Sequence, residues 1–91
     1  MTLEEHLERV TDLETFLAFV AALTEDREDE AAKEKERPID PCGRGANGWE
    51  NHTIESFLLA ALQWAEDSAQ LPQAPSWKGF ATFLYCGKIY E

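Results

Sequence analysis

Apolar residues recur at three- and four-residue spacing in three separate segments, and this periodicity constrains the fold more than any other feature of the sequence. No segment alternates apolar and polar residues with period two over a useful length, which argues against a sheet. The spacing predicts helices over about 12–36, 54–70 and 77–86. The clearest stripe, in the second segment, is made by Ile54, Phe57, Leu58, Ala61, Leu62, Trp64, Ala65 and Ala69.

Residues that favour helix starts and stops stand at the ends of these segments. Thr2–Glu5 has the form of a capping box, which predicts a short N-terminal helix, and Thr11–Glu14 repeats that form before the first long segment. Ser76 is placed to cap the third helix, and Asn51 or Thr53 the second. Gly87 has the position of a left-handed helix stop, so we expect the third helix to end at residue 86.

These elements predict an all-α fold, a compact bundle of the three main helices with the short N-terminal helix and a Gly/Pro-rich loop at 38–52. One helical domain would span residues 1–91. Phe19 falls at the edge of its stripe, and the three tryptophans are expected at the margin of the core, each indole N–H with an acceptor. The predicted centre of the core is Phe16, Val20, Phe57, Leu58, Leu62, Phe80 and Leu84.

The net charge of -10, from 18 acidic and 8 basic residues, restricts the classes of partner. Nucleic-acid backbones and anionic membranes both need a basic face, so neither is expected to bind. The longest apolar run, 16–23, is far shorter than the roughly 20 residues that span a bilayer. No signal peptide is evident, and Cys42 and Cys86 are too few for a disulfide framework, although one bridge between them is feasible. We therefore expect a cytoplasmic protein with free thiols.

The segment 24–37 is strongly acidic and holds no large apolar residue. Its residues are good helix formers, and Asp29 stands in helical register with Lys33, whereas Glu30 stands four residues from a like charge on each side. We interpret the segment as a solvated extension of the first long helix that frays towards Pro38. A disordered linker is the competing interpretation. The segment lacks the ligand order of a calcium loop.

Residue patterns typical of catalysis or of metal binding are weak. Gly43–Gly48 reads G-x-G-x-x-G, but no strand precedes it, so a nucleotide site is not expected. Two Cys and two His would suit zinc in kind, yet they are scattered singly rather than in close pairs. We therefore predict no catalytic residue, no cofactor and no metal. The two histidines and two cysteines that could form such a zinc set are His6, Cys42, His52 and Cys86.

The motifs W-E-N-x-T-I at 49–54, P-S-W at 75–77 and G-K-I-Y-E at 87–91 resemble a family of small acidic bacterial domains of unknown function. The segment 12–20 is similar to the opening helix of that family, so the resemblance covers most of the chain. It implies a bacterial, soluble, stand-alone domain. It carries over no catalytic residue.

Small size, negative charge and the lack of assembled chemistry favour a non-enzymatic module that binds a protein partner with a basic or mixed surface, since opposite charge speeds encounter. A toxin-neutralising immunity protein is the concrete form of this hypothesis. Two alternatives stay open: a homodimer packed through Trp49, Trp77 and Tyr90, and a small enzyme that uses Cys42 and His52. The candidate partner-binding residues are Glu25, Asp26, Glu28, Asp29, Trp49 and Glu50.

Overall fold

The computed structural model describes residues 1–36, 47–68 and 74–90, and these residues form four helices and no strand. The all-α prediction is therefore confirmed. Residues 38–46 of the predicted 38–52 loop, which include Cys42 and the first four residues of the glycine motif, lie outside the described residues. The helices are α1 (Leu3–Glu8), α2 (Leu13–Glu36), α3 (Ile54–Asp67) and α4 (Trp77–Ile89).

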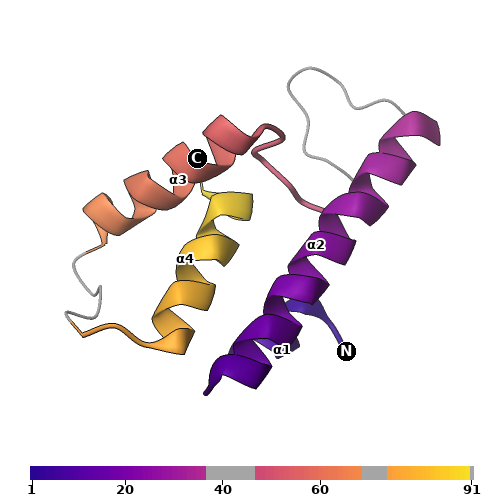
Figure 1. Cartoon of the computed structure of the whole chain (residues 1–91). Coiled ribbons are helices and arrows are strands. Elements are labelled where there is room, and N and C mark those ends of the chain that lie inside the picture. Colours follow the sequence, from indigo (N-terminus) through magenta and orange to yellow (C-terminus); the bar gives the residue numbers. More distant parts are fainter. Residues whose placement is uncertain (37–46, 69–73, 91) are drawn as a thin grey trace.

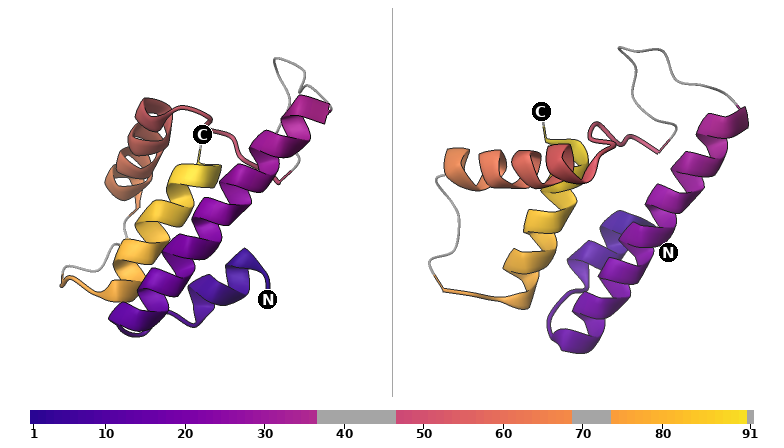
Figure 2. Two further views of the ribbon diagram at one scale, coloured as in Figure 1. Left: turned by 45° about the vertical axis from the view of Figure 1, so that its right-hand side comes forward. Right: turned by 45° about the horizontal axis from the view of Figure 1, so that its top comes forward.

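Helix α4 lies between α2 and α3 and packs against both (Figure 1). The short helix α1 lies against the N-terminal half of α2 and also contacts α4 (Figure 2). Among the described helices, α3 packs on α4 alone, and the C-terminal part of α2 extends beyond α4. One side of α3 is consequently left without a helix packed on it.

Capping hydrogen bonds fix where the helices begin. The capping box predicted at α1 is present: Glu5 N donates to Thr2 Oγ1 and Thr2 N to Glu5 Oε1, both at 3.1 Å. The predicted cap at Thr11 is wrong by one residue, because Asp12 Oδ1 instead accepts from Thr15 N at 2.9 Å. The hydroxyl of Ser76 caps α4 as predicted, accepting from Gly79 N.

The ends of two helices differ from the prediction. Helix α4 continues through Gly87 to Ile89, so the expected left-handed stop at Gly87 is wrong. Among the described residues, the glycine with a positive φ is instead Gly48, at 84°. A Cβ atom on Gly87 would lie 2.7 Å from Phe57 Cε2. Glycine at this position therefore allows α3 to approach α4 closely. Helix α3 ends at Asp67 rather than at residue 70, because Ser68 is extended.

The core is centred on a different face of α2 from the one predicted. Phe19 is fully buried, whereas Leu58, Leu62 and Phe80 are each about half exposed, and Trp49 is buried rather than marginal. Helix α1 and the chain around Trp49 pack on the side of α2 that carries Phe19. The buried face of α2 is therefore centred on Phe19 rather than on the predicted Phe16 and Val20. The buried cluster is Leu3, Val10, Phe19, Leu23, Trp49 and Ala81, with Phe16, Val20, Phe57 and Leu84 packed against it.

We expect Phe19→Ala to lower the free energy of unfolding by about 3–5 kcal/mol, because it leaves a cavity in the centre of the core. Leu17→Ala, at a half-exposed position two residues away on the same helix, should cost much less. Urea denaturation followed by circular dichroism measures both. Equal losses for the two variants would contradict the assignment of the core.

We expect Gly87→Ala to destabilise the protein, although alanine is about 0.8–1.0 kcal/mol more favourable than glycine in a helix interior. The added methyl group must displace the Phe57 ring, and overpacking of this kind costs about 1–3 kcal/mol. Phe57→Leu in the same chain should relieve part of the loss. A double-mutant cycle of unfolding free energies tests this, and strictly additive effects would count against the contact.

Candidate functional site

Three carboxylates stand four residues apart on α2 and face the chain that leads into α3. We call these residues, Asp26, Glu30 and Glu34, the acidic row, and the chain over residues 47–52 the connecting segment. The connecting segment also reaches α4, where Glu50 N donates to Lys88 O at 2.9 Å. The acidic row, the connecting segment and the end of α4 therefore meet in one polar cluster.

Asp26 is bound by two buried side chains. Lys88 Nζ lies 2.7 Å from Asp26 Oδ2, and the indole N–H of Trp49 donates to the same oxygen at 2.8 Å. Lys88 Nζ and Arg27 Cζ lie 5.7 and 5.8 Å from the centre of the Trp49 ring, within the range of cation–π contacts. The predicted acceptor for the Trp49 indole is therefore present.

Glu30 is fully buried, although it lies in the 24–37 extension of α2, which is predicted from the sequence to be solvated. Its Oε1 accepts hydrogen bonds from the backbone N–H groups of Asn47 and Trp49, each at 3.1 Å. Its Oε2 lies 3.7 Å from Arg27 Nη1 and 3.4 Å from His52 Nε2. The expectation of a uniformly solvated acidic segment is therefore wrong. Burial of this carboxylate is offset by the two backbone hydrogen bonds and by the neighbouring guanidinium of Arg27.

His52 contacts two members of the acidic row. Its Nε2 lies 3.5 Å from Glu34 Oε1, in addition to its contact with Glu30. His52 directly precedes Thr53, whose hydroxyl caps α3 by accepting from Ser56 N. The cap of α3 therefore holds the imidazole beside α2.

Two asparagines hold the connecting segment in place. Asn47 Nδ2 donates to Asp26 O and to Asp29 Oδ2, at 2.9 and 3.0 Å. Asn51 Nδ2 donates to Gly87 O and Tyr90 O, both at 2.9 Å, and so binds carbonyl groups at the C-terminal end of α4. The segment is therefore attached to α2 at its beginning and to α4 further along.

Hydrogen bonds and burial shift several pKa values in and near the cluster. The predicted pair of Asp29 and Lys33 is formed at 2.8 Å, and hydrogen bonding by Lys33 lowers the pKa of Asp29. Burial raises the pKa of the Cys86 thiol, which is free, as expected, and buried. At neutral pH this thiol therefore stays protonated and is a weak nucleophile.

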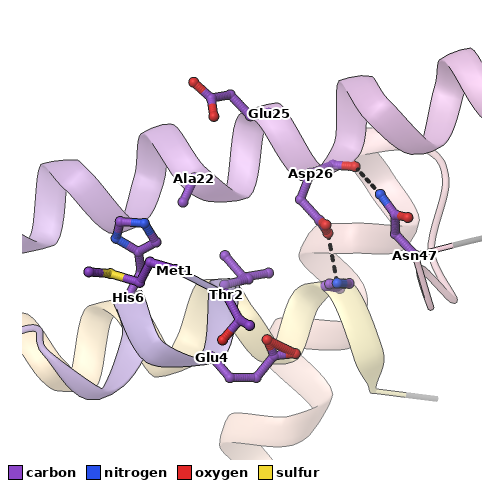
Figure 3. Close-up of a pocket in the computed structure, with 10 residues that line it drawn as sticks. Met1, Thr2, Glu4, His6, Ala22, Glu25, Asp26 and Asn47 are labelled. Carbon is purple, nitrogen blue, oxygen red and sulfur yellow. Dashed lines mark hydrogen bonds and ion pairs between the residues drawn. The ribbon is translucent and has the colours of Figure 1, made fainter.

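The six candidate partner-binding residues do not share one exposed surface. Asp26 and Trp49 belong to the internal cluster, and Asp29 is exposed but paired with Lys33. Glu25 and Glu28 are exposed, and Glu50 is half buried. Glu25 and Asp26 line a polar hollow of about 450 Å³ between α1 and α2, together with Glu4 (Figure 3). Five residues of the cluster are not among the six predicted from the sequence: Glu30, Glu34, Asn47, Asn51 and Lys88.

Fold and site together define a small helical domain in which the acidic row, with Glu30 fully buried, holds the connecting segment. The chain belongs to the family of unknown function DUF7660, whose model matches residues 11–91, and this confirms the expected membership of a family of unknown function. No curated protein and no solved structure matches the chain. Among the described helices, none has the length and apolar character needed to cross a membrane.

We expect Lys88→Met to lower the free energy of unfolding by roughly 2–4 kcal/mol, because it leaves the mostly buried carboxylate of Asp26 without its ammonium partner. Adding Asp26→Asn should recover part of this loss. The matched control is Lys33→Met, which removes an exposed pair of similar length, 2.8 Å, together with the hydrogen bond from Lys33 Nζ to Asn47 Oδ1, and should cost much less. Thermal and urea unfolding measure all three, and equal losses for the two lysines would contradict the assigned burial.

Proposed function

We propose that the protein is a non-enzymatic module that binds a protein partner through α3. The observation that carries this proposal is a row of exposed aliphatic side chains on that helix, with Ile54 78% and Leu59 64% exposed. Leu58 and Leu62 are about half exposed. These four residues, Ile54, Leu58, Leu59 and Leu62, form what we call the α3 apolar face. A large exposed apolar patch on a small domain is typical of an interaction site.

A hollow continues the α3 apolar face towards the acidic row. It has a volume of about 370 Å³, and its lining includes Ile54, Leu58, Phe57 and Trp49. The Trp49 and Phe57 rings stack with their centres 6.0 Å apart. An apolar side chain of a partner could enter this hollow while neighbouring side chains lie on the α3 apolar face. This is the arrangement by which grooves accept amphipathic helices.

Charge on α3 indicates the chemistry of the partner. The helix carries Glu55, Glu66 and Asp67, all exposed, and no Lys or Arg. The chain as a whole has a net charge of -10. We therefore propose that the partner presents an amphipathic segment with apolar residues at helical spacing and Lys or Arg beside them. Exposed Glu25 and Glu28 on α2 would then steer the encounter rather than anchor the complex.

The toxin-neutralising immunity role is the more specific form of this proposal, in which the partner is a toxin with such a basic amphipathic segment. The support for it is the same: small size, acidic charge and an exposed apolar face. A toxin-like reading frame beside the gene would favour it over other protein partners.

Two synthetic amphipathic peptides test the proposal. They share one leucine face and differ in their flanking residues, Lys/Arg in one and Glu in the other. In NMR titrations at low salt, we expect the basic peptide to shift the amides of α3 and to bind more tightly than the acidic one. Leu58→Ser should weaken binding roughly tenfold, the equivalent of losing one buried leucine. Leu17→Ser, equally exposed but on α2, is the matched control and should leave binding unchanged.

Three results would contradict the proposal. Equal affinity for the two peptides would show that charge does not contribute to binding. Equal effects of the two serine variants would show that the α3 apolar face is not the binding surface. A stable dimer of the wild-type chain in light scattering that Leu58→Ser dissociates would assign this face to a second copy instead.

A further inference from the structure

Glu30, Glu34 and His52 bring three metal-ligand atoms together from two parts of the chain. Glu30 Oε2, Glu34 Oε1 and His52 Nε2 all lie within 4.8 Å of one another. The imidazole nitrogen is 3.4 Å from the first oxygen and 3.5 Å from the second. The two glutamates stand four residues apart, so they project from the same face of α2.

An ion pair with histidine alone does not satisfy these carboxylates. Glu30 Oε2 and Glu34 Oε1 are both buried, and neither accepts a hydrogen bond from any described residue. A protonated imidazole has one N–H at Nε2, which cannot point at both oxygens. Both distances also exceed the 2.7–2.9 Å or so of a charge-assisted hydrogen bond. Both buried oxygens therefore lie beside His52 Nε2 without accepting a hydrogen bond from the described part of the chain.

The two separations that involve His52 Nε2, 3.4 and 3.5 Å, match the ligand shell of zinc. Zinc binds nitrogen and carboxylate oxygen at about 2.0–2.2 Å, so two ligands of a tetrahedral ion lie about 3.3–3.5 Å apart. An octahedral magnesium ion, with bonds of about 2.0–2.1 Å, would bring adjacent ligands to about 3.0 Å. We propose that Glu30, Glu34 and His52 bind one zinc ion.

The surroundings of the three residues suit a metal site. The backbone N–H groups of Asn47 and Trp49 bind Glu30 Oε1, which orients the other oxygen towards the ion, as the outer hydrogen bonds of ligating carboxylates do. Arg27 Nη1 approaches Glu30 Oε2 only to 3.7 Å and leaves that oxygen free to coordinate. The side chain of His52 is 32% exposed, which leaves access for a water molecule as the fourth ligand. This inference is independent of the protein-binding function proposed above.

Zinc titration of the full chain after chelator treatment tests the site. With zinc chloride in calorimetry, we expect one ion per chain, and X-ray absorption should show nitrogen and oxygen ligands at about 2.0–2.2 Å without sulfur at about 2.3 Å. Magnesium chloride should bind far more weakly. Glu34→Gln and His52→Gln should each reduce zinc affinity at least about tenfold, since each removes one of three protein ligands.

Matched controls separate this site from adventitious binding. Glu28→Gln on the same helix, His6→Gln and Cys42→Ser should all keep the wild-type zinc affinity, with circular dichroism confirming the helix content of every variant. The proposal is wrong if Glu34→Gln and His52→Gln, both folded, bind zinc as the wild type does. It is equally wrong if Cys42→Ser or His6→Gln abolishes binding, or if the wild-type chain takes up no zinc.

Discussion

The arrangement of the polar cluster depends on the hydrogen bonds that the buried carboxylate of Glu30 accepts. This carboxylate accepts the backbone N–H groups of Asn47 and Trp49, and thereby attaches the connecting segment to the middle of α2. Because α3 packs on α4 and not on α2, this segment sets where α3 begins relative to α2. The burial of Trp49 and the position of His52 beside the acidic row both follow from the same attachment.

The contacts of the acidic row explain how a chain with a large negative charge can bury carboxylates in its interior. Each carboxylate of the row has polar neighbours. Lys88 and the Trp49 indole lie at Asp26, Arg27 and two backbone N–H groups lie at Glu30, and the His52 imidazole lies at Glu34. Without such partners, the desolvation of even one carboxylate would exceed what a small core can offset. Exposed acids elsewhere leave the outer surface negative, which is the property that the proposed partner would recognise.

Local signals allowed much of the fold to be predicted from the sequence. Helical periodicity and the side-chain caps at Thr2 and Ser76 depend on neighbours a few residues away, and the structure agrees with them. The end of α4 was mispredicted because Gly87 has the form of a local helix stop. Its actual role depends on Phe57, thirty residues earlier in the chain. Long-range contacts of this kind leave no local pattern.

The candidate site was less predictable for the same reason. Glu30 was interpreted as repelled by the acids four residues away, because nothing near it in sequence shows that His52 and the N–H groups of the connecting segment lie beside it. The ligand order of a calcium loop is absent from the acidic segment, and the His and Cys residues are scattered, so neither pattern points to a mixed set of two glutamates and one histidine. The sequence signal that could have indicated the candidate site is the four-residue spacing of acids on α2, followed by a Trp and a His in the next segment.

The most direct test of this account is hydrogen exchange at the backbone amides of Asn47 and Trp49. If the Glu30 carboxylate binds both, the two amides exchange slowly in the wild-type chain, as the helical amides of α2 do, and exchange rapidly in Glu30→Ala while those of α4 stay protected. Exchange at the rate of an unstructured peptide in the wild type, or protection that survives removal of the carboxylate, would contradict the account.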